Sequence, residues 1–582
     1  MRPPTRTWQT FAPDREVLAV ARSVPAAGRL LDVCGLFDDR VGVTFTVPPG
    51  SRSEPGLEEM LRGAGFDPPV PWEQSLLRPT RYQLALAAST KGGLHRLPMP
   101  LLTMPHGAGH NRQVGERPGS LEHASGLDAD ELLHEGRVVP TRMAFSHPEQ
   151  VERLARTCPP AAGRGAVVGD PAFDRMLAAL GRRDRYRELL GVGDRRLVVL
   201  SSTWNAGSLL GAQRETVRAL LAGLPHDEYR MALVAHPNVW FSRRRGEIEQ
   251  WFADDVEAGL VLVPPFEGWR AAMIAADLVI GDAGSTTYYA AAIGRPVLLA
   301  AFDGADLDPA SPLPVFGAVM PRLDTESGAP PLEEQVAKAL RAAPMGVGDL
   351  LIAHPGGSAA RLRSLVYGLL ELPEPAGPAH YRPLPDPDRP PRAAGDVTAW
   401  RVAAEPVGGG LRLRRFPAGV RGPVGRALVV DAEDAVMTRW ESADAWSARR
   451  SAAEDPALEW AHGRLKRYPK AALAAVAVGD GALVLHRSGA AMRVRAAGGA
   501  PGAPAGEAPD AAVLAAAAVA WSRQGRPWRE WHEEVHVEVG GRTHRLRGTP
   551  PPAQFLFSGG RHPGAALSPG ARRARTRATG QV

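Results

Sequence analysis

Cysteine is scarce in this 582-residue sequence, where Cys34 and Cys158 are the only two. Two cysteines cannot form the disulfide framework of a secreted protein, so a reducing cytosol is the expected environment. Long apolar runs are lacking too, because no window reaches the roughly 18 apolar residues of a membrane-spanning helix. The first residues, MRPPTRTWQTFAPDREV, contain no apolar core of signal-peptide length. We therefore expect a cytoplasmic protein, with at most a peripheral contact at the inner face of the membrane.

Lysine is also rare, with four residues, so arginine supplies 65 of the 69 basic side chains. Enrichment in Ala, Gly, Pro and Arg is typical of GC-rich coding DNA. We attribute the pI of about 9.6 to this bias and to a basic run near the C-terminus. A net charge of +6 is too dilute over this length to indicate a specific nucleic-acid partner. It remains compatible with anionic membrane surfaces or phosphate-rich ligands.

The length implies more than one domain, and two stretches alternate short apolar strands with helices, as open parallel α/β domains do. The first stretch, residues 1–160, is expected to hold a helix at 16–24 that Pro25 ends, followed by strands at 41–47, 82–88, 101–104 and 143–146. The second, residues 161–372, is more regular, with strands at 197–201, 231–235, 260–263, 277–280 and 297–302 and a long helix at 245–258. The expected fold class is α/β, with a pair of Rossmann-type domains.

The remaining third has a different composition. Residues 373–395 form a Pro-rich linker, and residues 396–549 are expected to form a small α+β appendage, interrupted by a second linker at 498–509. Residues 550–582 are expected to form a disordered basic tail. Seven of the 13 Trp lie in the appendage. They either fill its core or form a surface for a partner, a sugar or a membrane.

One stretch, residues 277–303, has the pattern of a phosphate site. An apolar strand leads into the turn Gly281-Asp282-Ala283-Gly284, and Ser285 and Thr286 then open a helix. The first amides of a helix lack partners, and its dipole places roughly half a positive charge there, so an anion binds well at this end. The alternative is that the turn and its hydroxyls only cap the helix. Asp282 either contacts a donor or orients the turn.

Other polar clusters also follow predicted strands, at the sheet edge where open α/β folds bind ligands. In chain order they read HG, GDPxxD, S-x-TW, HP and GD-x-GS…GRPVLLAAFD. Over residues 95–370 this order resembles the CDP-glycerol glycerophosphotransferases, which make teichoic-acid-like polymers, and the wider GT-B glycosyltransferases and UDP-N-acetylglucosamine 2-epimerases. The resemblance implies a GT-B-like pair of domains, in which residues 1–160 contact the acceptor and residues 161–372 bind the nucleotide donor.

The resemblance also implies roles for individual residues. His106 occupies the position of the catalytic base, and His236 that of a second functional histidine. The positions that match nucleotide- or diphosphate-binding motifs are Gly169, Asp170, Thr203, Trp204, Asp282, Gly284, Ser285 and Thr286. The HG motif is followed by neither the family's threonine nor its lysine, so a basic role would fall to His110 or Arg112.

These expectations describe a transferase that moves a glycerophosphoryl or glycosyl group from a nucleotide-activated donor to an acceptor hydroxyl, in cell-envelope or polysaccharide biosynthesis. A loop histidine with a pKa near 6.5 suits the base, and the acceptor is expected to be a polymer or lipid-linked. Amide groups at the helix start and an imidazole such as His236 can meet the charge of the leaving group, so we expect no metal and no cofactor. The alternatives are an inactive GT-B scaffold that binds a partner through its Trp-rich appendage and basic tail, and a sugar-nucleotide 2-epimerase.

One further motif is rejected on geometry. His532-Glu533-Glu534-Val535-His536 matches the zinc-protease pattern HExxH, which needs both histidines on one helical face. Here VHVEV alternates and runs into Gly540-Gly541, which indicates a β-hairpin. On a strand the two histidines would be roughly 13 Å apart at about 3.3 Å per residue, too far to share a zinc ion.

Overall fold

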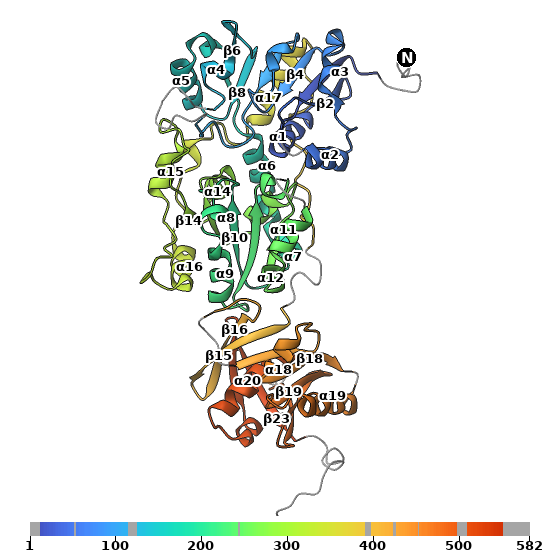
Figure 1. Cartoon of the computed structure of the whole chain (residues 1–582), viewed down its shortest axis with the longest axis vertical. Helices are drawn as coiled ribbons and strands as arrows, with labels where there is room; N and C mark the ends of the chain where they lie inside the picture. The colour runs from blue at the N-terminus through green and yellow to red at the C-terminus, as the bar shows by residue number, and fades with distance from the viewer. Residues whose placement is uncertain are drawn as a thin grey trace, which may run out of the picture.

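The computed structural model describes residues 12–51, 54–113, 125–241, 245–389, 397–422, 427–451, 453–497 and 509–550. They form two α/β domains and a β-barrel arranged in a row (Figure 1). The pair of Rossmann-type domains expected from the sequence is confirmed, with an α+β appendage after it. The predicted tail after Pro550, most of the second linker and the last residues of the first linker lie outside the described residues.

The first domain is built on a parallel sheet with the strand order β3-β2-β1-β4-β5-β8-β9. Alternate residues of β1, an inner strand, enter two different cores: Val17 and Ala19 pack on one face, Leu18 and Val20 on the other. Both faces are therefore buried, as expected for a parallel sheet covered by helices. The strands are β1 (Arg15–Val20), β2 (Val41–Val47), β3 (Val70–Pro71), β4 (Leu84–Ala87), β5 (Leu101–Thr103), β8 (Arg142–Phe145) and β9 (Gly165–Val167). Around them lie α1 (Val24–Cys34), α2 (Glu54–Gly63), α3 (Trp72–Leu76), α4 (Ala129–Leu132), α5 (Pro148–Thr157) and a small hairpin of β6 (Leu133–His134) and β7 (Arg137–Val138).

The predicted helix at 16–24 is wrong, because these residues form β1 and the turn after it. Pro25 begins a helix instead of ending one: it lies in the first turn of α1, where its missing N–H costs nothing. The domain boundary also differs from residue 160. Strand β9 still belongs to the first sheet, and α17 (Ser358–Leu370) returns to pack Val366 and Tyr367 into the core of the first domain.

The second domain has a five-stranded parallel sheet with the order β12-β11-β10-β13-β14. Its strands are β10 (Arg196–Ser202), β11 (Tyr229–Ala235), β12 (Leu260–Leu262), β13 (Leu278–Asp282) and β14 (Val297–Ala301). The predicted helix at 245–258 is two helices, Arg245–Trp251 and Ala253–Glu257. The helices are α6 (Pro171–Ala179), α7 (Arg183–Leu189), α8 (Leu209–Ala212), α9 (Glu215–Gly223), α10 (Pro237–Phe241), α11 (Arg245–Trp251), α12 (Ala253–Glu257), α13 (Trp269–Ala275), α14 (Ser285–Ala292), α15 (Leu313–Val319) and α16 (Leu332–Arg341).

The described part of the Pro-rich linker runs along the second domain and is not a free spacer. Arg175 donates to the carbonyl of Arg382, and Arg182 pairs with Asp386 at 3.0 Å. Leu384 is buried in the core of the second domain. The linker therefore contributes to the body that carries the two sheets.

The appendage is a closed barrel with the strand order β15-β16-β22-β23-β21-β20-β19-β18-β17. An alanine-rich helix, α20 (Ala511–Arg523), packs inside it, and every residue from Ala511 to Trp521 is buried. The barrel interior is thus filled by a helix. The strands are β15 (Ala399–Val407), β16 (Gly410–Pro417), β17 (Ala427–Asp431), β18 (Ala445–Ser451), β19 (Leu473–Val478), β20 (Gly481–His486), β21 (Ala491–Ala496), β22 (Val535–Val539) and β23 (Arg542–Thr549), with outer helices α18 (Met437–Ser442) and α19 (Glu454–Arg467).

The barrel tryptophans mainly fill its core. Trp400, Trp446, Trp521 and Trp531 are buried, which favours the core-filling interpretation over a partner-binding surface. The HExxH histidines do not share a helix, because His536 lies on β22. Among the described residues, no group of three or more His, Cys, Asp or Glu could hold a metal ion.

The barrel is docked on the second domain, at the end that faces away from the first domain (Figure 1). Arg415 of β16 is buried and pairs with Asp227 at 2.6 Å and with Asp510 at 3.2 Å. Val420 packs into the core of the second domain. The barrel is therefore fixed at a distance from the facing edges of the two sheets. None of the described helices combines the length and apolar character needed to cross a bilayer.

A leucine in place of Ala516 should destabilise the barrel, because Ala516 is fully buried in α20 and a larger side chain would have to displace its neighbours. We expect a cost of about 1–3 kcal/mol, as is typical of overpacking. Urea unfolding followed by the fluorescence of the paired rings Trp521 and Trp531, 5.7 Å apart, would measure it. The exposed Ala435→Leu in the same domain is the control, with an expected change within about 0.5 kcal/mol. Equal transition midpoints would contradict the tight packing.

Candidate functional site

A cavity of about 600 Å³ lies between the two α/β domains. Its walls come from the residues that follow β1, β4 and β5 in the first domain and β10, β11, β12 and β13 in the second. These are the carboxyl ends of parallel strands, where open α/β sheets bind ligands. Seven of the ten predicted site residues line the cavity, namely His106, Thr203, Trp204, His236, Gly284, Ser285 and Thr286.

The loop after β5 places His106 directly opposite the first turn of α14. The backbone N–H of Ala108 donates to Ser285 Oγ at 3.1 Å, so the two domains touch at this point. A Cβ atom at Gly107 would lie 2.5 Å from Ser285 Oγ, closer than any side chain allows. Glycine at this position therefore lets the histidine loop approach the helix.

The first turn of α14 faces the cavity without a side-chain cap, because its N-cap is Gly284. The turn before it is held by Asp282, which is 1 % exposed. Asp282 Oδ2 accepts hydrogen bonds from the backbone N–H of Thr203 at 2.7 Å, from Thr203 Oγ1 at 2.9 Å and from the N–H of Leu209 at 3.1 Å. Burial raises the pKa of Asp282, and these donors oppose the rise. Of the two roles predicted for Asp282, contact with a donor or orientation of the turn, these hydrogen bonds favour the second.

His236 follows β11 and is held in one tautomer. Its Nδ1 accepts a hydrogen bond from the backbone N–H of Asn238 at 3.0 Å, so in the neutral ring Nε2 carries the hydrogen. Burial is the main cause that lowers the pKa of His236 to about 3, and the proximity of His106 and Arg112 contributes to the same shift. His236 is therefore a neutral hydrogen-bond donor at physiological pH.

His106 is exposed within the cavity, yet its pKa lies below the ordinary value. Desolvation by the cavity walls is the main cause, and the charges of Arg29 and Arg112 lower the pKa too. A hydrogen bond with the backbone of Ala88 opposes the shift. A neutral imidazole at neutral pH can accept a proton, which is the requirement for a general base.

Of the two candidates for a basic role after the HG motif, only Arg112 keeps a charge. Burial lowers the pKa of His110 to about 3, and its Nδ1 lies 2.8 Å from the carbonyl oxygen of Ser125, which can only accept. His110 is therefore a neutral residue that holds the loop. Arg112 lines the cavity and pairs with Asp306 of the second domain.

Gly169 and Asp170 were predicted to bind the nucleotide, but they do not line the cavity. Asp170 is 1 % exposed and caps α6 by accepting from the N–H of Phe173 at 3.0 Å. Gly169 has φ +91°, and a Cβ there would lie 2.9 Å from the carbonyl oxygen of Ala353. Both residues therefore have a structural role beneath the cavity.

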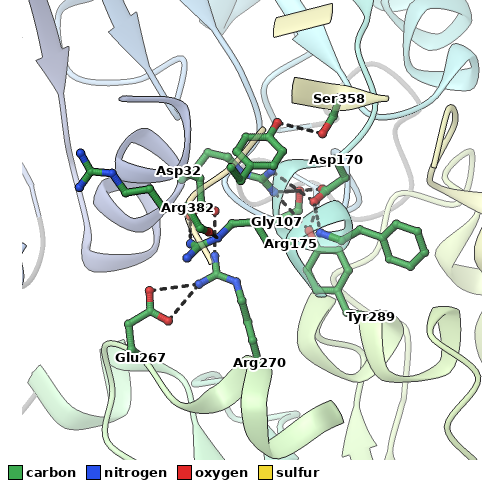
Figure 2. A network of polar contacts seen from close by, with 12 residues as sticks. Asp32, Gly107, Asp170, Arg175, Glu267, Arg270, Tyr289, Ser358 and Arg382 are labelled. Atoms are coloured by element: carbon green, nitrogen blue, oxygen red, sulfur yellow. Dashed lines mark hydrogen bonds and ion pairs between the residues drawn. The ribbon is translucent and has the colours of Figure 1, made fainter. Parts of the chain in front are cut away.

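Sequence reasoning missed a buried charge network below the cavity floor, shown in Figure 2. Arg29 of α1 pairs with Asp170 at 3.0 Å, and Asp32 of the same helix pairs with Arg270 at 2.8 Å and with Arg175. These contacts link α1 of the first domain to α6 and α13 of the second. The partners lie more than 140 positions apart in the chain, so no local pattern could have indicated them.

The cavity wall is cationic. Five described residues with a charged side chain line it, all of them basic, and no described lining residue carries a carboxylate. Four come from the first domain and one from the second, namely Arg22, Arg29, Lys91, Arg112 and Arg270. Four of the five pair with carboxylates of residues that do not line the cavity. The described lining thus presents only basic charged groups, which suits an anionic ligand.

No known family model matches the sequence, and no curated protein sequence matches it. Solved structures do match part of the chain, and several of the most similar ones are 10 to 16 % identical to it. They include the MnaA–UDP structure from S. aureus (10 % identity, TM-score 0.39, 63 % of this chain and 100 % of that one). A second is the UDP-GlcNAc 2-epimerase of Methanocaldococcus jannaschii with UDP-GlcNAc and UDP (13 % identity, TM-score 0.41, 61 % of this chain and 99 % of that one). A third is the wall teichoic acid polymerase TagF (11 % identity, TM-score 0.41, 62 % of this chain and 89 % of that one).

Proposed function

We propose that the protein is a transferase that moves a glycerophosphoryl or glycosyl group from a nucleotide-activated donor to an acceptor hydroxyl. The observation that carries the proposal is the convergence of His106, His236 and the first turn of α14 on one cavity between two parallel sheets. An uncapped helix start binds phosphate, and a neutral histidine opposite it serves as a base. The cationic wall favours a donor that carries a diphosphate.

In the proposed reaction, His106 takes the proton of the acceptor hydroxyl as the acceptor oxygen attacks the transferred group. The new bond is O–P for a glycerophosphoryl group and O–C for a glycosyl group. The bond to the nucleotide breaks, which releases a nucleoside monophosphate in the first case and a nucleoside diphosphate in the second. His236 Nε2–H and the amides of Ser285 and Thr286 donate to the departing phosphate oxygens, the electrostatic stabilisation on which such transfers depend.

The two alternative functions have less support. The inactive-scaffold hypothesis assigned partner binding to the Trp-rich appendage and the basic tail, and four of the appendage tryptophans are buried in the barrel domain. The 2-epimerase hypothesis expects carboxylates soon after the Gly-rich turn, where this chain has Thr287, Tyr288 and Tyr289, all buried. Analysis of the reaction products would separate an epimerase, which changes only the donor sugar, from a transferase. We place the protein in cell-envelope or polysaccharide synthesis, with a polymer or lipid-linked acceptor, as part of the same proposal.

A thermal-stability screen with CDP-, UDP-, GDP- and ADP-linked donors tests the donor site. A ligand at 100 times its dissociation constant should add about 2.7 kcal/mol of stability, and one nucleotide family should give the largest shift. The double variant Ser285→Ala/Thr286→Ala should reduce that shift, because it removes two hydroxyl groups from residues that line the cavity at the start of α14 and keeps their backbone amides. The control is Ser442→Ala on the barrel, far from the cavity. No shift with any donor would contradict the proposed function.

A further inference from the structure

Arg112 belongs to the first domain but is held against the second. The segment around it pairs in antiparallel fashion with residues 306–308: the N–H of Gln113 donates to the carbonyl of Asp306 at 3.0 Å, and the N–H of Asp308 donates to the carbonyl of Asn111 at 2.8 Å. The Arg112 guanidinium pairs with the Asp306 carboxylate. A short backbone bridge therefore fixes the direction from which this arginine enters the cavity.

A buried ion pair anchors the same bridge from behind. Arg153 of α5 and Asp308 are each 2 % exposed and lie 2.7 Å apart. By contrast, Arg112 and Asp306 are 36 % and 43 % exposed, and ion pairs with this exposure contribute little to stability. The bridge thus stays in place by its backbone and by Arg153, while the guanidinium of Arg112 is free to change its partner.

The position of Arg112 is central to the proposed chemistry. It lines the same cavity as His106 and His236, and its charge contributes to the lowered pKa of both rings. Two other basic residues of the wall are committed elsewhere: Arg29 is buried against Asp170, and Arg270 against Asp32 and Glu267. Lys91 pairs with Glu131, which is 9 % exposed. Among these four basic residues, Arg112 is therefore the one whose carboxylate partner is most exposed to solvent.

We propose that Arg112 is a phosphate-binding residue that the first domain supplies across the cleft, and that Asp306 occupies its guanidinium until a nucleoside diphosphate takes its place. The inference rests on the proposed function and names the group that meets the donor phosphates. A guanidinium forms two parallel, charge-assisted hydrogen bonds with phosphate oxygens. This contact is at least as strong as its exposed ion pair with a carboxylate. Because the backbone bridge holds the arginine in position, the exchange requires rotation of the side chain alone.

Isothermal titration of the full chain with CDP, UDP, GDP and ADP, and with the matching nucleosides, tests the inference. Arg112→Met should weaken binding of the preferred diphosphate roughly 10- to 100-fold, as for the loss of a charge-assisted contact, and leave nucleoside binding unchanged. Arg112→Lys should recover part of the loss. Asp306→Asn should tighten diphosphate binding, because the competing carboxylate is gone. Arg96→Met, an exposed arginine paired with Glu73 on the first domain, should change nothing.

The outcomes separate the inference from the function on which it rests. If the unaltered protein binds no nucleoside diphosphate, the proposed function and the inference about Arg112 are both overturned. If it binds one and Arg112→Met binds it equally well, the inference alone is overturned. Equal loss of nucleoside and diphosphate affinity in Arg112→Met would assign the arginine a structural role, which also overturns it. Weaker diphosphate binding in Asp306→Asn would overturn the exchange, because the carboxylate would then hold the arginine in its binding position.

Discussion

Replacing His106 with glutamine should slow turnover by roughly 10²- to 10⁴-fold, the usual contribution of a general base. Glutamine keeps the size and polarity of the side chain but cannot take the proton of the acceptor hydroxyl. Affinity for the donor nucleotide should stay within about twofold, because the phosphate contacts proposed above come from α14, His236 and Arg112. The measurement is nucleotide release from the donor that the stability screen identifies, with glycerol as a simple hydroxyl acceptor.

The pH dependence of the unaltered protein provides a second readout for the same residue. A base works only when it is neutral, so activity is lost as the pH falls through its pKa. The pKa of His106 is lowered by desolvation, Arg29 and Arg112, and the acid limb should therefore lie below the ordinary value near 6.5. In Arg112→Met this limb should move to higher pH, because a positive charge beside the imidazole has been removed.

The exposed histidine His95, which stacks on His134 in the first domain, offers a matched control. His95→Gln should leave both rate and pH profile unchanged. If His106→Gln retains more than about a tenth of the activity, His106 is not the base. An unchanged acid limb in Arg112→Met would show that the cavity arginine does not act on the titrating group.

The stretch at residues 277–303 could be predicted closely because its signals are local. An apolar strand, a Gly-rich turn, hydroxyls at the helix start and Gly294 at φ +81° after the helix each specify the backbone within a few residues. The same holds for α20, whose alanine-rich sequence favours a helix on propensity alone. The barrel around this helix could not be predicted, because it closes through pairs of strands that are distant in sequence, such as β16 with β22.

Strand β1 shows why a local signal can mislead. Glu16 and the alanines around it favour a helix on propensity, but the run is buried on both faces of the first sheet, where continuous apolar sequence is normal for a strand. Tertiary burial outweighed propensity there. The site was predicted where motifs follow strand ends, as at His106 and His236. Arg112 was also named from its position after the HG motif, but its pairing with Asp306 was missed, because the two residues lie far apart in the chain.

We expect the largest loss of stability when the buried charge network beneath the cavity is broken at Asp32. Asp32 is 5 % exposed and accepts from two buried arginines of the second domain, Arg175 and Arg270. Asp32→Ala should leave Arg175 without a carboxylate among the described residues and Arg270 with the half-exposed Glu267 alone. Removing one partner of a buried ion pair typically costs about 3–5 kcal/mol. The midpoint of urea unfolding should fall accordingly. Glu73→Ala, which breaks the exposed pair with Arg96, should cost at most about 1 kcal/mol.

A compensated variant separates uncompensated charge from lost packing. In Asp32→Leu/Arg175→Met/Arg270→Met all three charges are replaced by apolar side chains, and replacement of a buried ion group in this way is often neutral. This variant should therefore recover most of the stability that Asp32→Ala loses. Because the three residues connect α1 with α6 and α13, they also hold the two cavity walls together, so diphosphate affinity should follow the same order. If Asp32→Ala shifts the midpoint no more than Glu73→Ala does, the network does not hold the domains together.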